Sequence, residues 1–135
     1  MSTGAIRRAI HSDRFPKPVA SYSQGFQLGK MLFITGQLPV DPSTNLKVGD
    51  GDITLESRQV MQNMQAVLEE AGFGFEHLVS ATVYLTDIDG YSEMNEAYAQ
   101  YFEGIDPPSR VAMEISGLVG GALIEISFIA VKTDD

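Results

Sequence analysis

Three kinds of side chain in this sequence could do chemistry: an arginine, a glutamate and a few neutral hydrogen-bonding groups. Arg110 follows two prolines and opens residues 110–115, whose alternating apolar and polar side chains predict a strand. An arginine in a half-buried strand needs an anionic partner, and a guanidinium can hold a carboxylate through two parallel hydrogen bonds. Arg110 is therefore a candidate carboxylate-binding residue. The alternative interpretation is a structural salt bridge, for example to Glu114.

Glu125 is the second charged candidate, because it interrupts an otherwise apolar predicted strand at residues 122–132. A buried glutamate has a raised pKa and can act as a general base or orient a water molecule. The alternative interpretation is that Glu125 forms an ion pair with Arg110 or with a helix lysine.

Tyr22, Thr35 and Asn95 are the neutral candidates for orienting a ligand. Together with an arginine for a carboxylate and a glutamate for a water molecule, they would form a small-molecule hydrolytic site that needs no metal and no cofactor. His11 and His77 stand apart from any cluster of metal-binding residues, which favours surface roles. The chain has no cysteine, and the glycine-rich residues 117–121 lack the spacing of a phosphate-binding loop.

Composition limits the class of protein. The 135 residues are 44% hydrophobic and 20% charged, which predicts one globular domain over residues 1–135, with about 1–14 as a loose strand or arm. The formal net charge of -9 argues against a basic surface for nucleic acid or an anionic membrane. Because no secretory signal or membrane-spanning apolar run is visible, we expect a cytoplasmic protein.

Hydrophobic periodicity predicts the order hairpin, helix, strand, helix, hairpin. Strands are expected at residues 5–11, 26–28, 31–35, 78–85, 110–115 and 122–132, with a loop over residues 39–52. One helix should begin near Asp52 or Thr54 and end before Gly72. The other should begin near Asp87 or Asp89 and bury an aromatic stripe of Tyr91, Met94, Tyr98, Tyr101 and Phe102. This order predicts an α+β fold with one mixed sheet and two helices on one face.

The strand at residues 122–132 is apolar on both faces, and the one at residues 31–35 should also be buried on both sides. Two helices can cover only one face of such a sheet. We therefore expect partner subunits to bury the other face.

The candidate residues also carry a family resemblance that covers about residues 15–131. The most specific stretches are Tyr22-Ser23-Gln24-Gly25, Ile34-Thr35-Gly36-Gln37-Leu38-Pro39, Asn95-Glu96-Ala97-Tyr98 with Phe102, Pro108-Ser109-Arg110 with Glu114, and Leu123-Ile124-Glu125-Ile126. Taken together they resemble the Rid family of reactive-intermediate deaminases, also called YjgF or L-PSP proteins.

The resemblance implies a chorismate-mutase-like fold with a six-stranded sheet, and a homotrimer whose sheets form a central barrel with sites in the clefts between subunits. It implies hydrolysis of 2-imino and enamine acids, such as 2-aminoacrylate and 2-iminopropanoate, to 2-oxo acids and ammonia, without a cofactor. Arg110 would hold the substrate carboxylate and Glu125 would position or activate water. Tyr22, Thr35, Asn95 and a backbone group near Ala112 would line the pocket.

Three positions depart from the family pattern, and the family has several activities. Ala20-Ser21 stands where Gly-Pro is frequent, Ala112 where some members have cysteine, and Val119 where proline is usual. The alternatives are a carboxylate-binding regulatory trimer without turnover, a related deaminase such as one for 2-aminomuconate, and an endoribonuclease. The charge of -9 disfavours the last, because tight RNA binding needs a basic surface.

Overall fold

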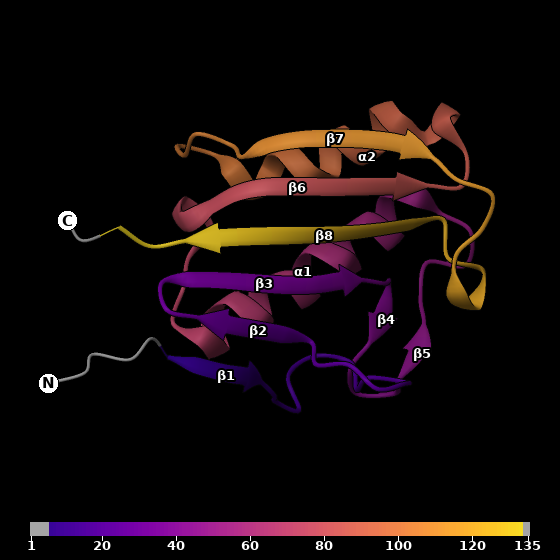
Figure 1. The fold of residues 1–135 in the computed structure, drawn as a ribbon. Helices are drawn as coiled ribbons and strands as arrows, with labels where there is room; N and C mark the ends of the chain where they lie inside the picture. Colours follow the sequence, from indigo (N-terminus) through magenta and orange to yellow (C-terminus); the bar gives the residue numbers. More distant parts are fainter. Residues whose placement is uncertain (1–5, 134–135) are drawn as a thin grey trace, which may run out of the picture.

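The computed structural model describes residues 6–133, which form one six-stranded sheet with two helices on one face (Figure 1). The strands run in the order β1-β2-β3-β8-β6-β7, and all neighbours are antiparallel except β6 and β7. Their bounds are Arg7–Ile10 (β1), Gly25–Leu28 (β2), Met31–Gln37 (β3), Leu78–Leu85 (β6), Ser109–Glu114 (β7) and Ile124–Val131 (β8). The predicted α+β fold is confirmed.

The long helix α1 (Ile53–Ala71) begins and ends where its capping residues predict. The Asp52 carboxylate accepts hydrogen bonds from the backbone N–H groups of Thr54 and Leu55, at 2.9 and 3.2 Å. Gly72 ends the helix in the left-handed conformation, with φ of 79°, which glycine adopts without strain. A second helix, α2 (Tyr91–Ala99), follows a short 3-10 turn at Ile88–Gly90, which the Asp87 side chain caps.

The core lies between the sheet and the two helices. The helix-facing residues of the central strands alternate with residues on the open face, as the pleat requires. Core residues include Leu32, Ile34, Val60, Met61, Met64, Val67, Leu85, Met94, Ile124, Ile126 and Phe128.

Three details differ from the predictions. The second predicted hairpin does not form: β7 pairs in parallel with β6, while β8 crosses back to lie between β3 and β6. The predicted loop at residues 39–52 contains a small hairpin, β4 (Val40–Asp41) and β5 (Leu46–Lys47). On β3, the apolar residues Leu32 and Ile34 are buried, whereas Met31 and Phe33 remain exposed on the open face.

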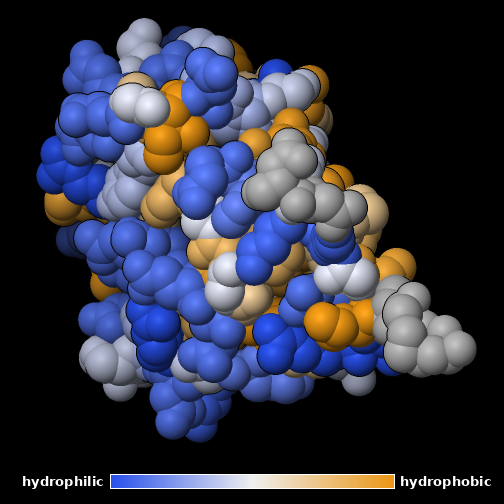
Figure 2. Space-filling model, turned by 90° about the vertical axis from the view of Figure 1, so that its left-hand side faces the viewer, coloured by the Kyte–Doolittle hydropathy of each residue, from blue (hydrophilic) through white to orange (hydrophobic). Residues whose placement is uncertain are grey.

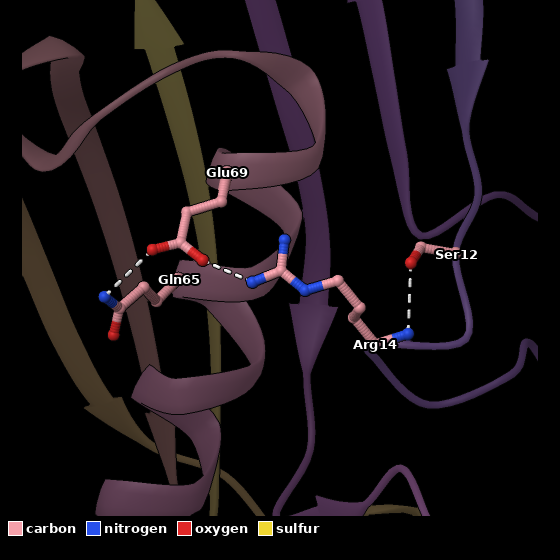
Figure 3. A network of polar contacts seen from close by, with 4 residues as sticks. All are labelled: Ser12, Arg14, Gln65 and Glu69. Atoms are coloured by element: carbon pink, nitrogen blue, oxygen red, sulfur yellow. Dashed lines mark hydrogen bonds and ion pairs between the residues drawn. The ribbon is translucent and has the colours of Figure 1, made fainter.

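The N-terminal segment is attached to α1 through Arg14. The Arg14 guanidinium forms an ion pair with Glu69, whose other oxygen accepts a hydrogen bond from Gln65 (Figure 3). This hydrogen bond from Arg14 lowers the pKa of the Glu69 carboxyl. The predicted edge strand is present as β1, and its first predicted residue, Ala5, lies outside the described residues. Within residues 6–133, neither helix is long and apolar enough to cross a membrane.

Candidate functional site

Glu125 lies on β8 with its side chain on the open face of the sheet, because Ile124 and Ile126 on either side are buried under the helices. Its carboxylate lies against Gly36 of β3, where a Cβ atom would come within 2.2 Å of Glu125 Oε2. Glycine at position 36 therefore makes room for the carboxylate. Partial burial raises the pKa of Glu125, as predicted, which favours a proton-accepting role near neutral pH.

Tyr22 lies beside Gly36 in a cleft of about 190 Å³. Thr35, which precedes Gly36, holds the Tyr22 segment against β3: its N–H donates to the Gln24 carbonyl at 3.0 Å, and its hydroxyl donates to the Ser23 carbonyl at 2.5 Å. The β3–β8 register shifts between Ile34 and Gln37, so Thr35 and Gly36 lie at an irregularity where the strand bends. Tyr22, Thr35 and Glu125 thus belong to one group.

Part of the lining of this cleft is attached to helix α1. Asn63, which is 2% exposed, donates its amide hydrogens to the carbonyls of Leu38 and Val40 at 3.1 and 2.8 Å. Leu38 and Val40 both line the cleft beside Gly36. The helix therefore fixes the position of the chain that follows Gly36.

Arg110 and Asn95 form a second group, on the other side of the sheet. Arg110 lies on β7 and points toward α2, where its Nη2 donates to the Tyr91 hydroxyl at 2.7 Å. The guanidinium carbon lies 4.8 Å from the centre of the Tyr98 ring, within the range of a cation–π contact. Asn95 lies one turn after Tyr91, and its side chain lowers the pKa of the Tyr91 hydroxyl.

A cleft of about 440 Å³ opens beside the Arg110 guanidinium. Its lining residues are Asn95, Tyr98, Ala99, Phe102, Pro107, Pro108 and Arg110. The walls are mostly apolar, with one amide and one guanidinium as polar groups, which suits a small ligand that carries one carboxylate. Ala112, two residues further along β7, packs its side chain against the core.

The structural salt-bridge interpretation of Arg110 is wrong for residues 6–133. Glu114 instead accepts a hydrogen bond from the Ile88 backbone N–H at 2.8 Å. The ion pairs among the described residues join Arg14 to Glu69, Lys47 to Glu56, and His77 to Glu76. Neither Arg110 nor Glu125 takes part in them, so both alternatives that paired these side chains within the described chain are excluded.

The two groups do not face one another within one chain. Arg110 lies opposite Ala81 of β6, whose side chain is buried under the helices, whereas Glu125 lies opposite Tyr84, whose side chain is on the open face. The pleat therefore puts the guanidinium and the carboxylate on opposite faces of the sheet, two strands apart. A single ligand cannot contact both within one copy.

The predicted buried aromatic stripe is wrong at Tyr91, which is 37% exposed and contacts Arg110. Met94, Tyr98 and Phe102 are buried as predicted, and Tyr101 is partly buried. The i, i+4 spacing of Tyr91 and Asn95 could have indicated that both lie on one helix face beside Arg110. Burial raises the pKa of Tyr98 to about 12, so its hydroxyl stays protonated.

The histidines have no part in either group. The His77 Nδ1 atom accepts a hydrogen bond from the Gly74 backbone N–H at 2.9 Å and caps a short turn, and His11 is exposed. No set of three or more His, Asp or Glu side chains within residues 6–133 could hold a metal ion.

Comparison with known proteins agrees with the fold and the motifs. Residues 12–132 match the family model described as endoribonuclease L-PSP. A RutC family protein of Pyrococcus horikoshii is 44% identical over 94% of this chain and 99% of its own length. The 2-iminobutanoate/2-iminopropanoate deaminase of mouse is 35% identical over 94% of this chain and 93% of its own length.

The structural comparison gives the same result. The crystal structure of YyfA from Yersinia pestis, described as a protein of unknown function of the conserved Rid family, has a TM-score of 0.91 and 36% identity, covering 94% of this chain and 100% of that one. The chain therefore belongs to the L-PSP family, the Rid or YjgF family that its motifs resemble.

Proposed function

We propose that the protein hydrolyses reactive 2-imino and enamine acids, of the 2-aminoacrylate and 2-iminopropanoate type, to 2-oxo acids and ammonia without a cofactor. The observation that carries this proposal is the environment of the Arg110 side chain. Its guanidinium borders an open cleft, is oriented by two tyrosines, and has no carboxylate partner among residues 6–133. A small substrate carboxylate supplies the missing anion.

Glu125 supplies the second function. Its carboxylate accepts a proton from water as the water oxygen attacks C2 of the imine, whose nitrogen takes up a proton. Glu125 passes the water proton to this nitrogen and then moves the hydroxyl proton of the resulting carbinolamine to the amino group. The carbon–nitrogen bond breaks, ammonia leaves, and the 2-oxo acid remains bound through its carboxylate. The balance is one imine and one water converted into one 2-oxo acid and one ammonia. The raised pKa of Glu125 supports this role, because a carboxylate with a higher pKa is a stronger base.

A second copy of the chain is needed to complete this site, since Arg110 and Glu125 lie on opposite faces of one sheet. The open face carries exposed or half-buried apolar side chains on β3, β7 and β8, namely Met31, Phe33, Val111, Met113, Ile129 and Val131. In Figure 2, polar side chains dominate the left side, where the helices lie, and apolar ones gather toward the right, where the open face lies. We propose that further copies cover this face in a homotrimer and bring the Arg110 group of one copy to the Glu125 group of another.

The test is ammonia release from 2-iminopropanoate and 2-iminobutanoate, generated in situ by a dehydratase. We expect the protein to accelerate release and Arg110→Ala to lose about 2–5 kcal/mol of transition-state stabilisation, the scale of a buried charged contact. Glu125→Gln should also lose activity while still binding the 2-oxo acid product. Arg58→Ala, which removes an exposed arginine of α1, is the matched control and should keep full activity. Unchanged turnover in Arg110→Ala would contradict the proposal.

The family model's description as an endoribonuclease suggests RNA cleavage as another activity. The chain's net charge of -9 disfavours it, since RNA affinity depends on neutralising phosphates with basic side chains. A tight RNA complex that weakens steeply with salt would favour this activity over deamination.

A further inference from the structure

Tyr91 is the residue at which the two predicted ligand-binding side chains of β7 and α2 meet. Arg110 Nη2 donates to its hydroxyl oxygen at 2.7 Å, and the Asn95 side chain is close enough to the same hydroxyl to lower the pKa of Tyr91. Tyr91 is the first residue of α2 and Asn95 lies one turn later, so a single helix turn presents both groups to Arg110.

Orientation of the guanidinium requires such contacts, because the arginine side chain is long and has several rotatable bonds. The guanidinium carbon of Arg110 lies over the Tyr98 ring, 4.8 Å from its centre, and this contact restrains the position of the guanidinium. The Tyr91 hydroxyl accepts a hydrogen bond from Nη2 at one edge of the guanidinium and so restrains the rotation of this group. The remaining N–H groups then point in a fixed direction, toward a ligand in the cleft that Arg110 and Asn95 line.

We propose that Tyr91 is a positioning residue for ligand binding: its hydroxyl orients Arg110 so that the guanidinium addresses the carboxylate end of the ligand. Tyr91 does not line the cleft and acts through Arg110. The proposal rests on the proposed function only in taking Arg110 as the carboxylate-binding group. The Asn95 hydrogen bond and the nearby Arg110 charge lower the pKa of Tyr91, in agreement with a hydroxyl oxygen surrounded by donors.

Tyr91→Phe tests the role, since it removes the hydroxyl and keeps the ring. Two quantities are measured: the Kd for 2-oxobutanoate by calorimetry, and KM and kcat for 2-iminobutanoate hydrolysis. We expect both Kd and KM to rise about three- to ten-fold, as for the loss of one hydrogen bond, with kcat within about two-fold of wild type. Tyr101→Phe is the matched control, because its hydroxyl contacts the Arg58 carbonyl, away from the cleft.

A side-chain NMR spectrum of arginine-labelled protein gives an independent readout. The Arg110 Nε–H signal, identified by its loss in Arg110→Lys, should be sharp in wild type and broadened in Tyr91→Phe, while the melting temperatures stay within a few degrees. An unchanged Arg110 signal would overturn the positioning role even if Tyr91→Phe were less stable. Unchanged Kd and KM would overturn it as well, and tighter binding by Tyr91→Phe would show instead that the hydroxyl competes with the ligand.

The two proposals can fail separately. If wild type binds 2-oxobutanoate but releases no ammonia, hydrolysis is refuted, and the Kd comparison still decides the role of Tyr91. If wild type turns over the imine and Tyr91→Phe matches it in Kd, KM and kcat, the role of Tyr91 is refuted and hydrolysis stands. Absence of 2-oxobutanoate binding to wild type overturns the carboxylate-binding role of Arg110 and the positioning role with it.

Discussion

At the scale of single residues, Arg110 and Glu125 differ in the environment of their charged groups. Two tyrosine side chains contact the Arg110 guanidinium: both present their ring faces, at 5.5 Å for Tyr91 and 4.8 Å for Tyr98, and Tyr91 also accepts a hydrogen bond. Glu125 is half-buried beside a glycine, and desolvation is the cause of its raised pKa. One site therefore holds an oriented cation, and the other holds a carboxylate whose ionised form is disfavoured.

The raised pKa of Glu125 predicts a pH-dependent effect on stability. Between the ordinary pKa of an unfolded glutamate and the higher folded pKa, the folded state keeps the proton that the unfolded state has lost, so stability falls as pH rises through this window. Glu125→Gln cannot ionise and should melt at a higher temperature than wild type at pH 7, with the difference shrinking as the pH is lowered below the ordinary pKa. Thermal unfolding across pH measures it, with Glu70→Gln on the exposed side of α1 as the control. A melting difference that is independent of pH would contradict the prediction.

Gly36→Ala should displace the Glu125 carboxylate without unfolding the protein. The added Cβ would lie 2.2 Å from Oε2 and 2.6 Å from Cδ of Glu125, which is the flexible end of a side chain and can move away. Because a small misplacement of a catalytic group is costly, we expect turnover of the 2-imino acid to fall about ten- to hundred-fold. Gly117→Ala is the matched control, since its Cβ would meet nothing within 4 Å. Full activity of Gly36→Ala would show that turnover does not depend on the position of the Glu125 carboxylate.

At the scale of elements, local signals predicted most of the fold. The Asp52 cap, the apolar stripe and Gly72 indicated α1, and strict alternation indicated β6. The pairing of β7 was not predictable in this way, because β-strand partners are set by tertiary packing and by the crossover helix between them. The β4–β5 hairpin was missed because its two-residue strands lie in a stretch rich in turn residues.

The candidate residues were predictable because their side chains are costly to bury unpaired, as with Arg110 on a half-buried strand. Tyr91 was missed because a tyrosine on an amphipathic helix has the same pattern whether it packs in the core or contacts a neighbouring strand. The importance of Gly36 depends on a long-range contact with Glu125 that no local pattern contains.

Asn63 joins an element to the site, and its removal should cost stability. Asn63→Ala removes the two hydrogen bonds that its amide donates to the carbonyls of Leu38 and Val40, and the Leu38 carbonyl keeps only the Val40 N–H as a donor, so we expect the free energy of unfolding to fall by about 2 kcal/mol. Urea unfolding measures the change. Gln65→Ala on the same helix, which removes only an exposed hydrogen bond to Glu69, should change stability by no more than about 0.5 kcal/mol. Equal losses in the two variants would show that the Asn63 hydrogen bonds contribute no special stability.

At the scale of the whole molecule, the sheet has one covered face and one open face, and the proposed site needs both. The helices cover the face from which Arg110 points toward α2, and the other face, with Glu125, carries apolar side chains that no element of residues 6–133 covers. Removing apolar surface of this kind from water stabilises the assembly that buries it. Assembly through the open face would therefore both bury this area and bring the two charged groups together, which links oligomeric state to activity.

Phe33→Asp tests this link. Phe33 is 39% exposed in the single chain, pairs across the strands with Ile129, and lies on the open face away from Arg110 and the Tyr91 hydroxyl. A carboxylate there would be buried without a partner in the assembly, so we expect sedimentation to show monomers in place of trimers and imine turnover to be lost, while circular dichroism shows the same secondary structure. Leu55→Asp, which places the same charge on an exposed apolar position of α1, is the matched control and should remain assembled and active. If Phe33→Asp became monomeric and kept its activity, one copy would suffice for catalysis, and Arg110 and Glu125 could not both act on the same substrate molecule.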